Sequence, residues 1–205
     1  MKRALALAVM GAVMAACGGG SSGGSSPGGS TGGTGPTGGS STQIGFVLPA
    51  TTCSGISLAG VAVFVATNQS ISNACTQVSN ACVKYANLDG VALIVANYTS
   101  TGTAAAVTPG TYSISTTPST SGTMAFATLV ETDASCNSDA PSGTASGTIT
   151  LTSVTSTTVT GSYDITLGSQ NLTGTIDATL CTTTFPGDVC SGSSSGTCTG
   201  TTQCL

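Results

Sequence analysis

Hydrophobic residues recur at alternate positions along several stretches of this chain. From 158 to 167, and again from 171 to 180, apolar and polar side chains alternate almost strictly. Strict alternation predicts β-strands with one face buried and the other in solvent. Other stretches, such as 61–65 and 91–95, are apolar at nearly every position, which is typical of strands covered on both faces.

Clusters of Gly, Asn, Pro and Ser separate these runs, and no stretch keeps a helical period over three turns. The pattern predicts strands near residues 43–49, 56–66, 91–98, 111–115, 123–131, 146–152, 158–167 and 171–180. We therefore expect an all-β fold, an antiparallel β-sandwich of about eight strands. Residues 68–85 are expected to form a short helix or a long loop.

The last two predicted strands indicate a hairpin. Pairing Gly168 with Asn171 closes a two-residue loop. This register sets Tyr163 opposite Ile176 on the buried face. The opposite face is then rich in hydroxyl groups and consists of Thr160, Ser162, Asp164, Thr166, Thr173, Thr175, Asp177 and Thr179.

In the same register Asp164 and Asp177 are diagonal neighbours, about 7–8 Å apart. Two carboxyl groups at that spacing could serve as the acid and base of an inverting glycosidase, or share a calcium ion. Glu131 and Asp133, two positions apart along one predicted strand face, form a second candidate pair. The alternative is a solvated face whose few charges keep it soluble, and the lack of aromatic or cationic residues nearby favours it.

A further string of oxygen-bearing side chains has the spacing of a calcium-binding loop: Asp133, Ser135, Asn137 and Asp139. It lacks the glycine and the glutamate that such loops carry at their sixth and twelfth positions. Cys136 in the middle of the string favours a turn held by a disulfide instead.

The composition excludes several kinds of chemistry. The chain has no His, which removes His-based catalytic triads and His-ligated metal sites. Its basic residues are only Lys2, Arg3 and Lys84, too few for a phosphate-binding surface, so nucleic acid is not an expected partner. Low charge combined with a mean hydropathy of +0.35 favours a folded body over a disordered one. We expect no cofactor and no enzymatic activity.

The N-terminus has the parts of an export signal. Lys2 and Arg3 precede an apolar run at 4–13, which is too short for the ~20 residues of a membrane-spanning helix. The string Met14-Ala15-Ala16-Cys17 places small residues before a cysteine and so resembles the lipobox of bacterial lipoprotein precursors, although Met14 replaces the usual Leu. The alternative is an ordinary signal peptide cut after an A-x-A-like site.

The lipobox resemblance implies that residues 1–16 are removed, that Cys17 is acylated on its thiol and amine, and that the acyl chains anchor the protein in a lipid bilayer. Gly18, in place of Asp after the cysteine, implies transfer to the outer membrane. Residues 18–42 contain only Gly, Ser, Thr and Pro. That composition predicts a flexible tether with an end-to-end distance of about 25–30 Å.

Eight cysteines remain if Cys17 is acylated: Cys53, Cys75, Cys82, Cys136, Cys181, Cys190, Cys198 and Cys204. An even number outside the inner membrane predicts disulfides, four in all, that cross-link the domain. A zinc site fits poorly because there is no C-x-x-C string and no His.

The spacing leaves the disulfide pairing open. Cys75 and Cys82 are close enough to close one loop, while Cys136 and Cys181 could join two strand ends. Cys53 would then pair with one of the C-terminal cysteines, at 190, 198 or 204, and hold the tail on the body. These expectations divide the mature chain into Cys17 and its tether (17–42), a β-sandwich domain (43–190) and a tail packed on that domain (191–205).

Three predicted strands of the body, around Gly147–Leu151, Gly161–Asp164 and Gly174–Cys181, resemble those of Ser/Thr/Gly-rich envelope lipoproteins of Gram-negative bacteria. The resemblance implies an envelope location and no particular chemistry. We therefore expect a non-catalytic binding or structural protein whose partners are the bilayer and an envelope polymer or protein. The alternatives are a secreted hydrolase that uses a carboxylate pair, and a carbohydrate- or calcium-binding module, against which the absence of Trp counts.

Overall fold

The computed structural model describes residues 41–80, 83–114, 121–138, 144–183, 185 and 201–205. Most of their regular structure is β-strand. The long strands and β5 are β1 (Thr42–Cys53), β2 (Ile56–Ala66), β4 (Asp89–Thr99), β5 (Gly110–Ser113), β6 (Gly122–Glu131), β7 (Ala145–Val154), β8 (Thr158–Leu167) and β9 (Gln170–Leu180). The short elements are α2 (Ala74–Val78), β3 (Val83–Lys84) and β10 (Gln203–Cys204). The expected all-β fold is confirmed.

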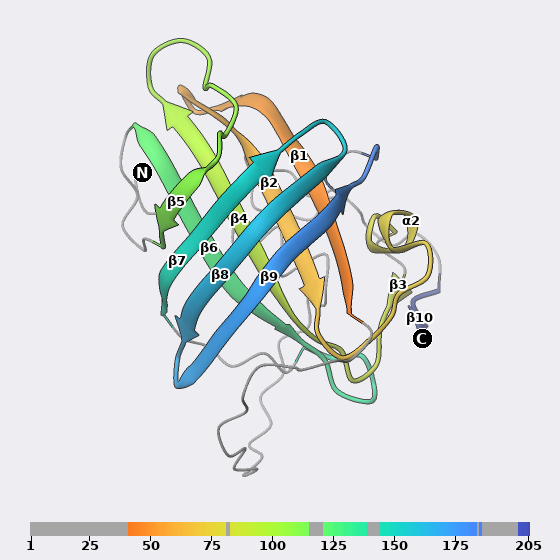
Figure 1. The fold of residues 1–205 in the computed structure, drawn as a ribbon. Helices are drawn as coiled ribbons and strands as arrows, with labels where there is room; N and C mark the ends of the chain where they lie inside the picture. The colour runs from red at the N-terminus through yellow and green to blue at the C-terminus, as the bar shows by residue number, and fades with distance from the viewer. Residues whose placement is uncertain (1–40, 81–82, 115–120, 139–143, 184, 186–200) are drawn as a thin grey trace.

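Eight strands form one sheet in the order β5-β7-β8-β9-β1-β2-β4-β6. Figure 1 shows how this sheet folds over, so that β7, β8 and β9 form a layer in front of β1, β2, β4 and β6. All neighbouring pairs are antiparallel except β1 and β9, which are parallel. A bridge between Ile114 and Ala125 brings the two outer strands of the sheet together. The two layers of the sandwich are therefore parts of one continuous sheet.

The space between the layers is filled by an inner cluster of apolar side chains. β2, β4 and β6 contribute Val63, Leu93 and Leu129, and the facing layer contributes Ile149, Ile165 and Ile176. On each of these strands the members of the cluster occupy every second position, as Val61, Val63 and Val65 do on β2. Every second side chain of a strand points to the same face, so the alternation seen in the sequence marks the face that points to the interior.

The outer face of β1, β2, β4 and β6 is also apolar, and its side chains form a second, outer cluster. The main members on the strands are Ile44, Phe46, Leu48, Leu58, Phe64, Ile94, Tyr98, Met124 and Phe126. Residues 69–80, which include α2, and residues 83–88 pack against this cluster through Ile71, Ala74 and Leu88. The ring of Phe185 meets that of Phe46 edge-on, with centroids 5.8 Å apart. Apolar side chains on both faces explain why β2, β4 and β6 lack alternation in the sequence.

The hairpin of β8 and β9 differs from its predicted register. Leu167 pairs with Gln170, so Gly168 and Ser169 form the two-residue loop, and Gly168 has a positive φ of 61°. Tyr163 consequently pairs with Gly174 and not with Ile176. A side chain at 174 would collide with the Tyr163 ring, because a Cβ there would lie 2.5 Å from its hydroxyl oxygen. The shift of two residues keeps every side chain on its predicted face, and Tyr163 is buried as expected.

Candidate functional site

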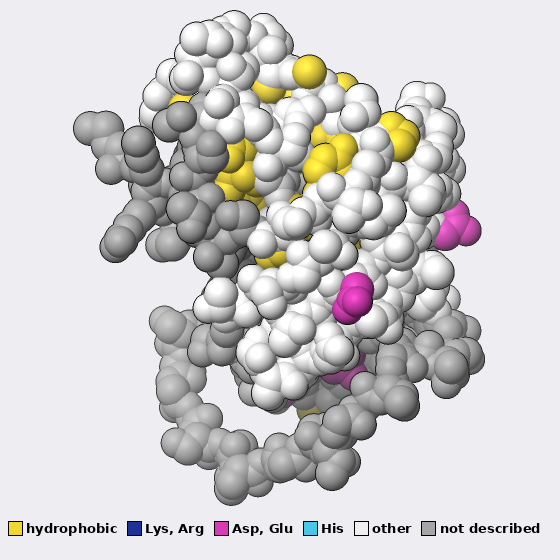
Figure 2. All heavy atoms as spheres, turned by 60° about the vertical axis from the view of Figure 1, so that its left-hand side comes forward, with side chains coloured by type: hydrophobic (Ala, Val, Ile, Leu, Met, Phe, Trp, Pro, Cys, Tyr) yellow, Lys and Arg dark blue, Asp and Glu magenta, His cyan; other side chains and the backbone are white. Residues whose placement is uncertain are grey.

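The outer face of β5, β7, β8 and β9 is covered with hydroxyl groups. Its side chains are Thr111, Ser113, Ser146, Thr148, Thr150, Thr152, Thr160, Ser162, Asp164, Thr166, Asn171, Thr173, Thr175, Asp177 and Thr179, all exposed or half-buried. We call this surface the hydroxyl face. Figure 2 turns the β5 and β7 side toward the reader, and its described residues show acidic and scattered apolar side chains but no basic one.

The side chains of the hydroxyl face stand in rows across the strands. One row runs through successive pairing partners on β5, β7, β8 and β9, namely Thr111, Thr150, Ser162 and Thr175. Neighbouring strands lie about 4.7–4.9 Å apart, which sets the spacing within each row. The hydroxyl groups of Thr111 and Thr150 are 3.0 Å apart, and those of Thr152 and Thr160 are 2.9 Å apart. Cross-strand hydrogen bonds of this kind hold the side chains in a regular array.

Gln43 on β1 continues the hydrogen bonding of the sheet beside this face. Its Nε2 donates to the carbonyl oxygen of Thr175 at 3.1 Å, and its Oε1 accepts from the backbone N–H of Asp177 at 2.8 Å. The side chain thus joins β1 to β9 near the start of their parallel pairing. Sequence reasoning missed this role because the partners lie more than 130 residues away along the chain.

Asp164 and Asp177 are not diagonal neighbours, which corrects the expectation from the predicted register. Asp164 pairs with Thr173 and Asp177 pairs with Thr160, so the two carboxylates are offset by four positions along the strands. At about 3.3 Å per residue that offset is roughly 13 Å. Both side chains are exposed on an open sheet face. Asp164 and Asp177 are therefore too far apart to act together on one bond or to bind one calcium ion.

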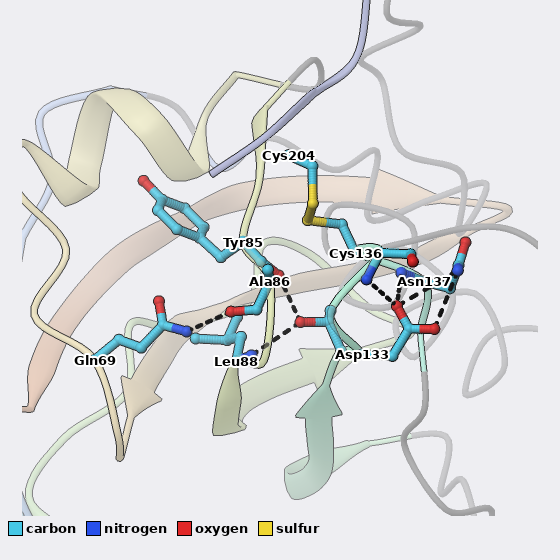
Figure 3. The surroundings of a disulfide bond; sticks show 10 residues. Gln69, Tyr85, Ala86, Leu88, Asp133, Cys136, Asn137 and Cys204 are labelled. Carbon is cyan, nitrogen blue, oxygen red and sulfur yellow. Dashed lines mark hydrogen bonds between the residues drawn. A yellow bond between two sulfur atoms is a disulfide. The ribbon is translucent and has the colours of Figure 1, made fainter.

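Glu131 and Asp133 do not share a strand face either. β6 ends at Glu131, which pairs with Asp89, and Asp133 lies in the following turn. The Asp133 Oδ1 accepts hydrogen bonds from the backbone N–H groups of Asn137 at 2.9 Å and Ser135 at 2.8 Å (Figure 3). Together with the Asn137 side chain, these bonds hold the pKa of Asp133 below its usual value. A carboxyl group stabilised as its anion is poorly suited to act as a general acid.

Residues 133–138 of the calcium-like string form a turn whose hydrogen bonds lie within the turn itself. Asn137 Nδ2 donates to the second carboxylate oxygen of Asp133 at 3.1 Å, so both oxygens accept hydrogen bonds from within the turn. Cys136 has a positive φ of 61° and is bonded to Cys204. Within the described ranges, His, Cys, Asp and Glu form no group of three or more that could hold a metal ion. Asp139, the last residue of the string, lies outside the described residues.

Disulfides cross-link the outer-cluster side of the sheet. Cys75 on α2 is bonded to Cys181, with 5.4 Å between their Cα atoms, and Cys136 is bonded to Cys204, with 5.8 Å. Cys53 is disulfide-bonded as well. The remaining cysteines of the expected set, together with the expected lipidation site, lie outside the described residues: Cys17, Cys82, Cys190 and Cys198.

Two suggested pairings are therefore wrong: Cys75 does not pair with Cys82, and Cys136 does not pair with Cys181. The reason is the end of β9. The backbone N–H of Cys181 donates to the carbonyl oxygen of Gly45 at 2.7 Å, which fixes this cysteine beside β1. α2 contacts β1 as well, and so brings Cys75 to it.

The last residues of the chain pair with the body. β10 lies parallel to β3, with Gln203 opposite Val83 and Cys204 opposite Lys84. The backbone N–H of Leu205 donates to the Lys84 carbonyl oxygen at 3.0 Å. The Cys136–Cys204 disulfide holds this short sheet against the turn at Asp133 (Figure 3).

A small cavity lies beneath this C-terminal sheet. Its volume is about 20 Å³, and its walls include Phe64, Ile71, Val83 and Leu88. A cavity of this size holds about one water molecule, so it is too small for a substrate. Burial raises the pKa of Tyr85, which also lines it.

Two buried hydroxyl groups have structural roles that sequence reasoning missed. Thr132 Oγ1 accepts from the backbone N–H of Leu88 at 3.0 Å and donates to the carbonyl oxygen of Tyr85 at 2.5 Å. Ser57 Oγ accepts from the backbone N–H of Ala104 at 3.0 Å. Each hydroxyl fixes a loop to the end of a strand, and a single Thr or Ser in a Thr-rich sequence gives no signal of such a role.

Among the described residues, no helix combines the length and hydropathy that crossing a membrane requires. Comparison with protein-family models, curated proteins and solved structures finds no match to this chain.

Proposed function

We propose that this chain is a lipid-anchored protein of the outer membrane that binds an envelope component and performs no catalysis. The observation that carries the proposal is the hydroxyl face, a continuous array of Thr and Ser side chains across four strands. Such an array offers hydrogen-bond donors, acceptors and methyl groups at regular intervals.

The chemistry of the face favours a long polar partner. An extended polymer laid across the strands would meet a hydroxyl group about every 4.7–4.9 Å, which suits a polysaccharide with its own regular hydroxyl groups. Asp164 and Asp177 give the face a negative charge and no basic residue balances them there, which disfavours anionic polymers.

Catalysis lacks support from the described residues. The two carboxylates of the face are offset by roughly 13 Å, and the Asp133 carboxylate is held as an anion by its own turn. The cavity beside Tyr85 has room for about one water molecule. The separated aspartates of the face and the carboxylate of Asp133 therefore do not form the acid–base pair that a carboxylate-based hydrolase needs.

Lipid anchoring rests on the sequence of residues 1–42. Removal of residues 1–16 leaves Lys84 as the only basic residue beside seven acidic ones. A body of that charge is repelled by anionic headgroups, so it needs both acyl chains at Cys17 and a spacer to remain near a membrane. The Gly/Ser/Thr/Pro segment that follows Cys17 supplies the spacer.

The anchor is tested by expressing the full chain in a Gram-negative host and separating the membranes. Cys17→Ala should release the protein from the membrane fraction, and globomycin should cause the uncut precursor of the wild-type chain to accumulate. Ser21→Ala, four residues along the tether, is the control and should remain membrane-bound. A Cys17→Ala protein that fractionates like the wild type would overturn the anchor.

Binding is tested by co-sedimentation of the full mature protein with insoluble envelope polysaccharide. Ser162→Arg combined with Thr175→Arg places two large cations on adjacent exposed positions of the face and should weaken binding at least about tenfold. Ser156→Arg with Thr103→Arg adds the same charge at exposed loop positions and should leave binding unchanged. Equal binding by both variants, no binding by the wild type, or release of soluble sugar would each contradict the proposal.

A further inference from the structure

The first half of β9 is an open edge of the sheet. β9 is the last strand of the front layer, and it pairs with β1 only at Thr179 and Leu180 (Figure 1). The Gln43 side chain extends this contact back as far as the carbonyl oxygen of Thr175. Among the described residues, no strand pairs with residues 170–174 on the side that points away from β8.

The ladder with β8 decides which backbone groups point to this open side. In an antiparallel pair, the N–H and C=O groups of alternate residues point toward the partner strand, and those of the residues between point away. The carbonyl oxygen of Thr175 and the N–H of Asp177 both bond to Gln43, so the odd-numbered residues of β9 point away from β8. Asn171 and Thr173 therefore present two N–H and two C=O groups at the edge, and both residues are exposed.

This edge lacks the features by which sheet proteins prevent pairing with other chains. Such features include prolines, charged side chains, bulges and very short strands. Beyond its pairing with β9, β1 carries Pro49 and a register shift between Leu48 and Thr51. Residues 170–175, by contrast, contain neither Pro nor a charged residue, and β8 and β9 pair without a shift. An edge of this kind is suited to the addition of another strand.

We propose that a second copy of this chain adds its own β9 to this edge, with the two strands antiparallel about a two-fold axis at Leu172. In this register Asn171 of each copy lies opposite Thr173 of the other. Each of these two pairs exchanges two N–H···O bonds, which gives four bonds in all. Every N–H and C=O group that Asn171 and Thr173 present at the edge is then used.

Leu172 provides the apolar part of this contact. Its side chain is half-buried and packs against the inner cluster. On the axis it lies opposite its own copy in a pair without direct hydrogen bonds, with about 4.5 Å between the Cα atoms. Each leucine then covers the exposed part of the other, so the pairing removes apolar surface from water at the rim of the inner cluster.

The charges of the sheet are compatible with pairing between two copies. Asp177 lies five positions from the axis, so it is ten positions, or roughly 33 Å, from its own copy. Asp164 pairs with Thr173, which places it three strand spacings, at least about 14 Å, from its own copy. Both distances exceed the Debye length of about 8 Å at physiological ionic strength. The edge itself is uncharged, which suits an equally uncharged strand such as its own copy.

Pairing at this edge joins the hydroxyl faces of the two copies. Residues directly opposite each other in an antiparallel pair lie on the same side of the sheet, so Asn171 and Thr173 continue the face from one copy into the next. The inference does not depend on what that face binds. Four hydrogen bonds and one leucine pair make a small interface, so the association is expected to be weak.

Sedimentation equilibrium of the oxidised full chain carrying Cys17→Ala tests the pairing, because this substitution removes the acylation that the proposed function expects. A monomer–dimer equilibrium with a dissociation constant between about 1 μM and 1 mM is expected. Leu172→Lys and Leu172→Glu each place like charges opposite each other and should raise the dissociation constant at least about tenfold. An equimolar mixture of the two variants should restore association, because opposite charges then meet on the axis.

Val47→Lys adds the same charge at an exposed apolar position of β1 and is the control, which should associate like the parent. The proposal is overturned by a parent chain that remains monomeric at about 1 mM. It is equally overturned if the mixture of Leu172 variants does not associate, or if Val47→Lys loses association while Leu172→Lys keeps it.

A second pair of variants leaves the packing of Leu172 unchanged. Thr173→Pro removes an N–H that points away from β8, so the ladder with β8 is retained. In the dimer it deletes two of the four hydrogen bonds and should weaken association at least about tenfold. Thr173→Val keeps both the N–H and the branched shape, and should associate within about twofold of the parent. Equal association of Thr173→Pro and Thr173→Val would show that the copies do not pair in this register.

Discussion

The two halves of the sheet differ in what lies on their outer faces. On β7, β8 and β9 apolar side chains point inward and hydroxyl groups point to solvent, whereas β2, β4 and β6 are apolar on both sides and β1 turns its buried apolar residues outward. The first half needs only the facing layer to bury its core. The second half also buries apolar side chains on its outer face, where α2, other residues of 69–80 and 83–88, and Phe185 pack against it.

The disulfides follow the same division. Cys53, Cys75 and Cys181 belong to or pack against the outer cluster, and Cys136 and Cys204 hold the short C-terminal sheet beside it. A helix of five residues and a two-residue strand are too short to be stable alone. Covalent bonds therefore help to keep these short elements on the sheet, whereas the side chains of the hydroxyl face are exposed or half-buried.

Reduction of the disulfides should have the largest effect on stability, because it frees α2 and the C-terminal strand β10 from their covalent links to the rest of the chain. The Cys75–Cys181 and Cys136–Cys204 bonds close 106 and 68 residues. Loops of that size correspond to about 4–5 kcal/mol each in the chain-entropy model, against a typical net stability of about 5–15 kcal/mol. We expect the reduced protein to be unfolded or molten at 37 °C, with near-UV circular dichroism lost and dye binding increased. A melting temperature that is indifferent to reductant would contradict this.

The next largest effects should come from alanine substitutions, whose cost in unfolding free energy should differ between the outer faces of the two halves. On β4, Leu93→Ala faces the interior and Ile94→Ala faces outward, and both should lower the unfolding free energy by about 2–5 kcal/mol because both side chains are buried. On β9, Ile176→Ala should cost as much, whereas the neighbouring Thr175→Ala should change it by no more than about 0.5 kcal/mol. Urea unfolding measures all four. Similar costs for Ile94→Ala and Thr175→Ala would remove the distinction between the halves.

Thr132→Val should have an intermediate effect on the covered half. The substitution keeps the shape of the side chain but leaves the backbone N–H of Leu88 and the carbonyl of Tyr85 without their hydroxyl partner. We expect a loss of about 1–3 kcal/mol in unfolding free energy. Thr132→Ser retains the hydroxyl and is the matched control. Equal stability of the two variants would show that these hydrogen bonds contribute little.

The smallest effect should be the pH dependence that comes from Asp133. Its pKa is lowered in the folded protein, so its contribution is present above its unfolded pKa and is lost as the pH falls through the folded value. Between pH 5 and 2, the wild type should therefore lose slightly more stability than Asp133→Asn, which cannot titrate. Identical pH profiles would show that the turn does not favour the carboxylate.

Alternation together with continuous apolar runs was enough to place the long strands approximately, and the alternating stretch 158–167 coincides with β8. It could not fix the register of β8 and β9, because shifts of two residues keep the same faces and only the packing of Tyr163 over Gly174 decides between them. The carboxylate pair at Asp164 and Asp177 was predicted from that register and moved apart with it.

Contacts between distant parts of the chain were beyond sequence reasoning. The parallel pairing of β1 with β9 and the bond between Cys75 and Cys181 both depend on how the sheet folds over. Chain spacing alone favoured nearer partners for these cysteines. The hydroxyl face, by contrast, was predicted in its β8 and β9 part, because alternation specifies which side chains share a face whatever the register.

The central claim is that one outer face is covered and the other is open, and hydroxyl-radical labelling of the oxidised full chain tests it most directly. Met124 and Phe126, on the outer face of β6, should be labelled as weakly as Leu93 in the interior, and far less than Val47, which is 48% exposed. Reduction should raise their labelling toward that of Val47. Strong labelling of Met124 and Phe126 in the oxidised protein would show that the face is open and would contradict the account.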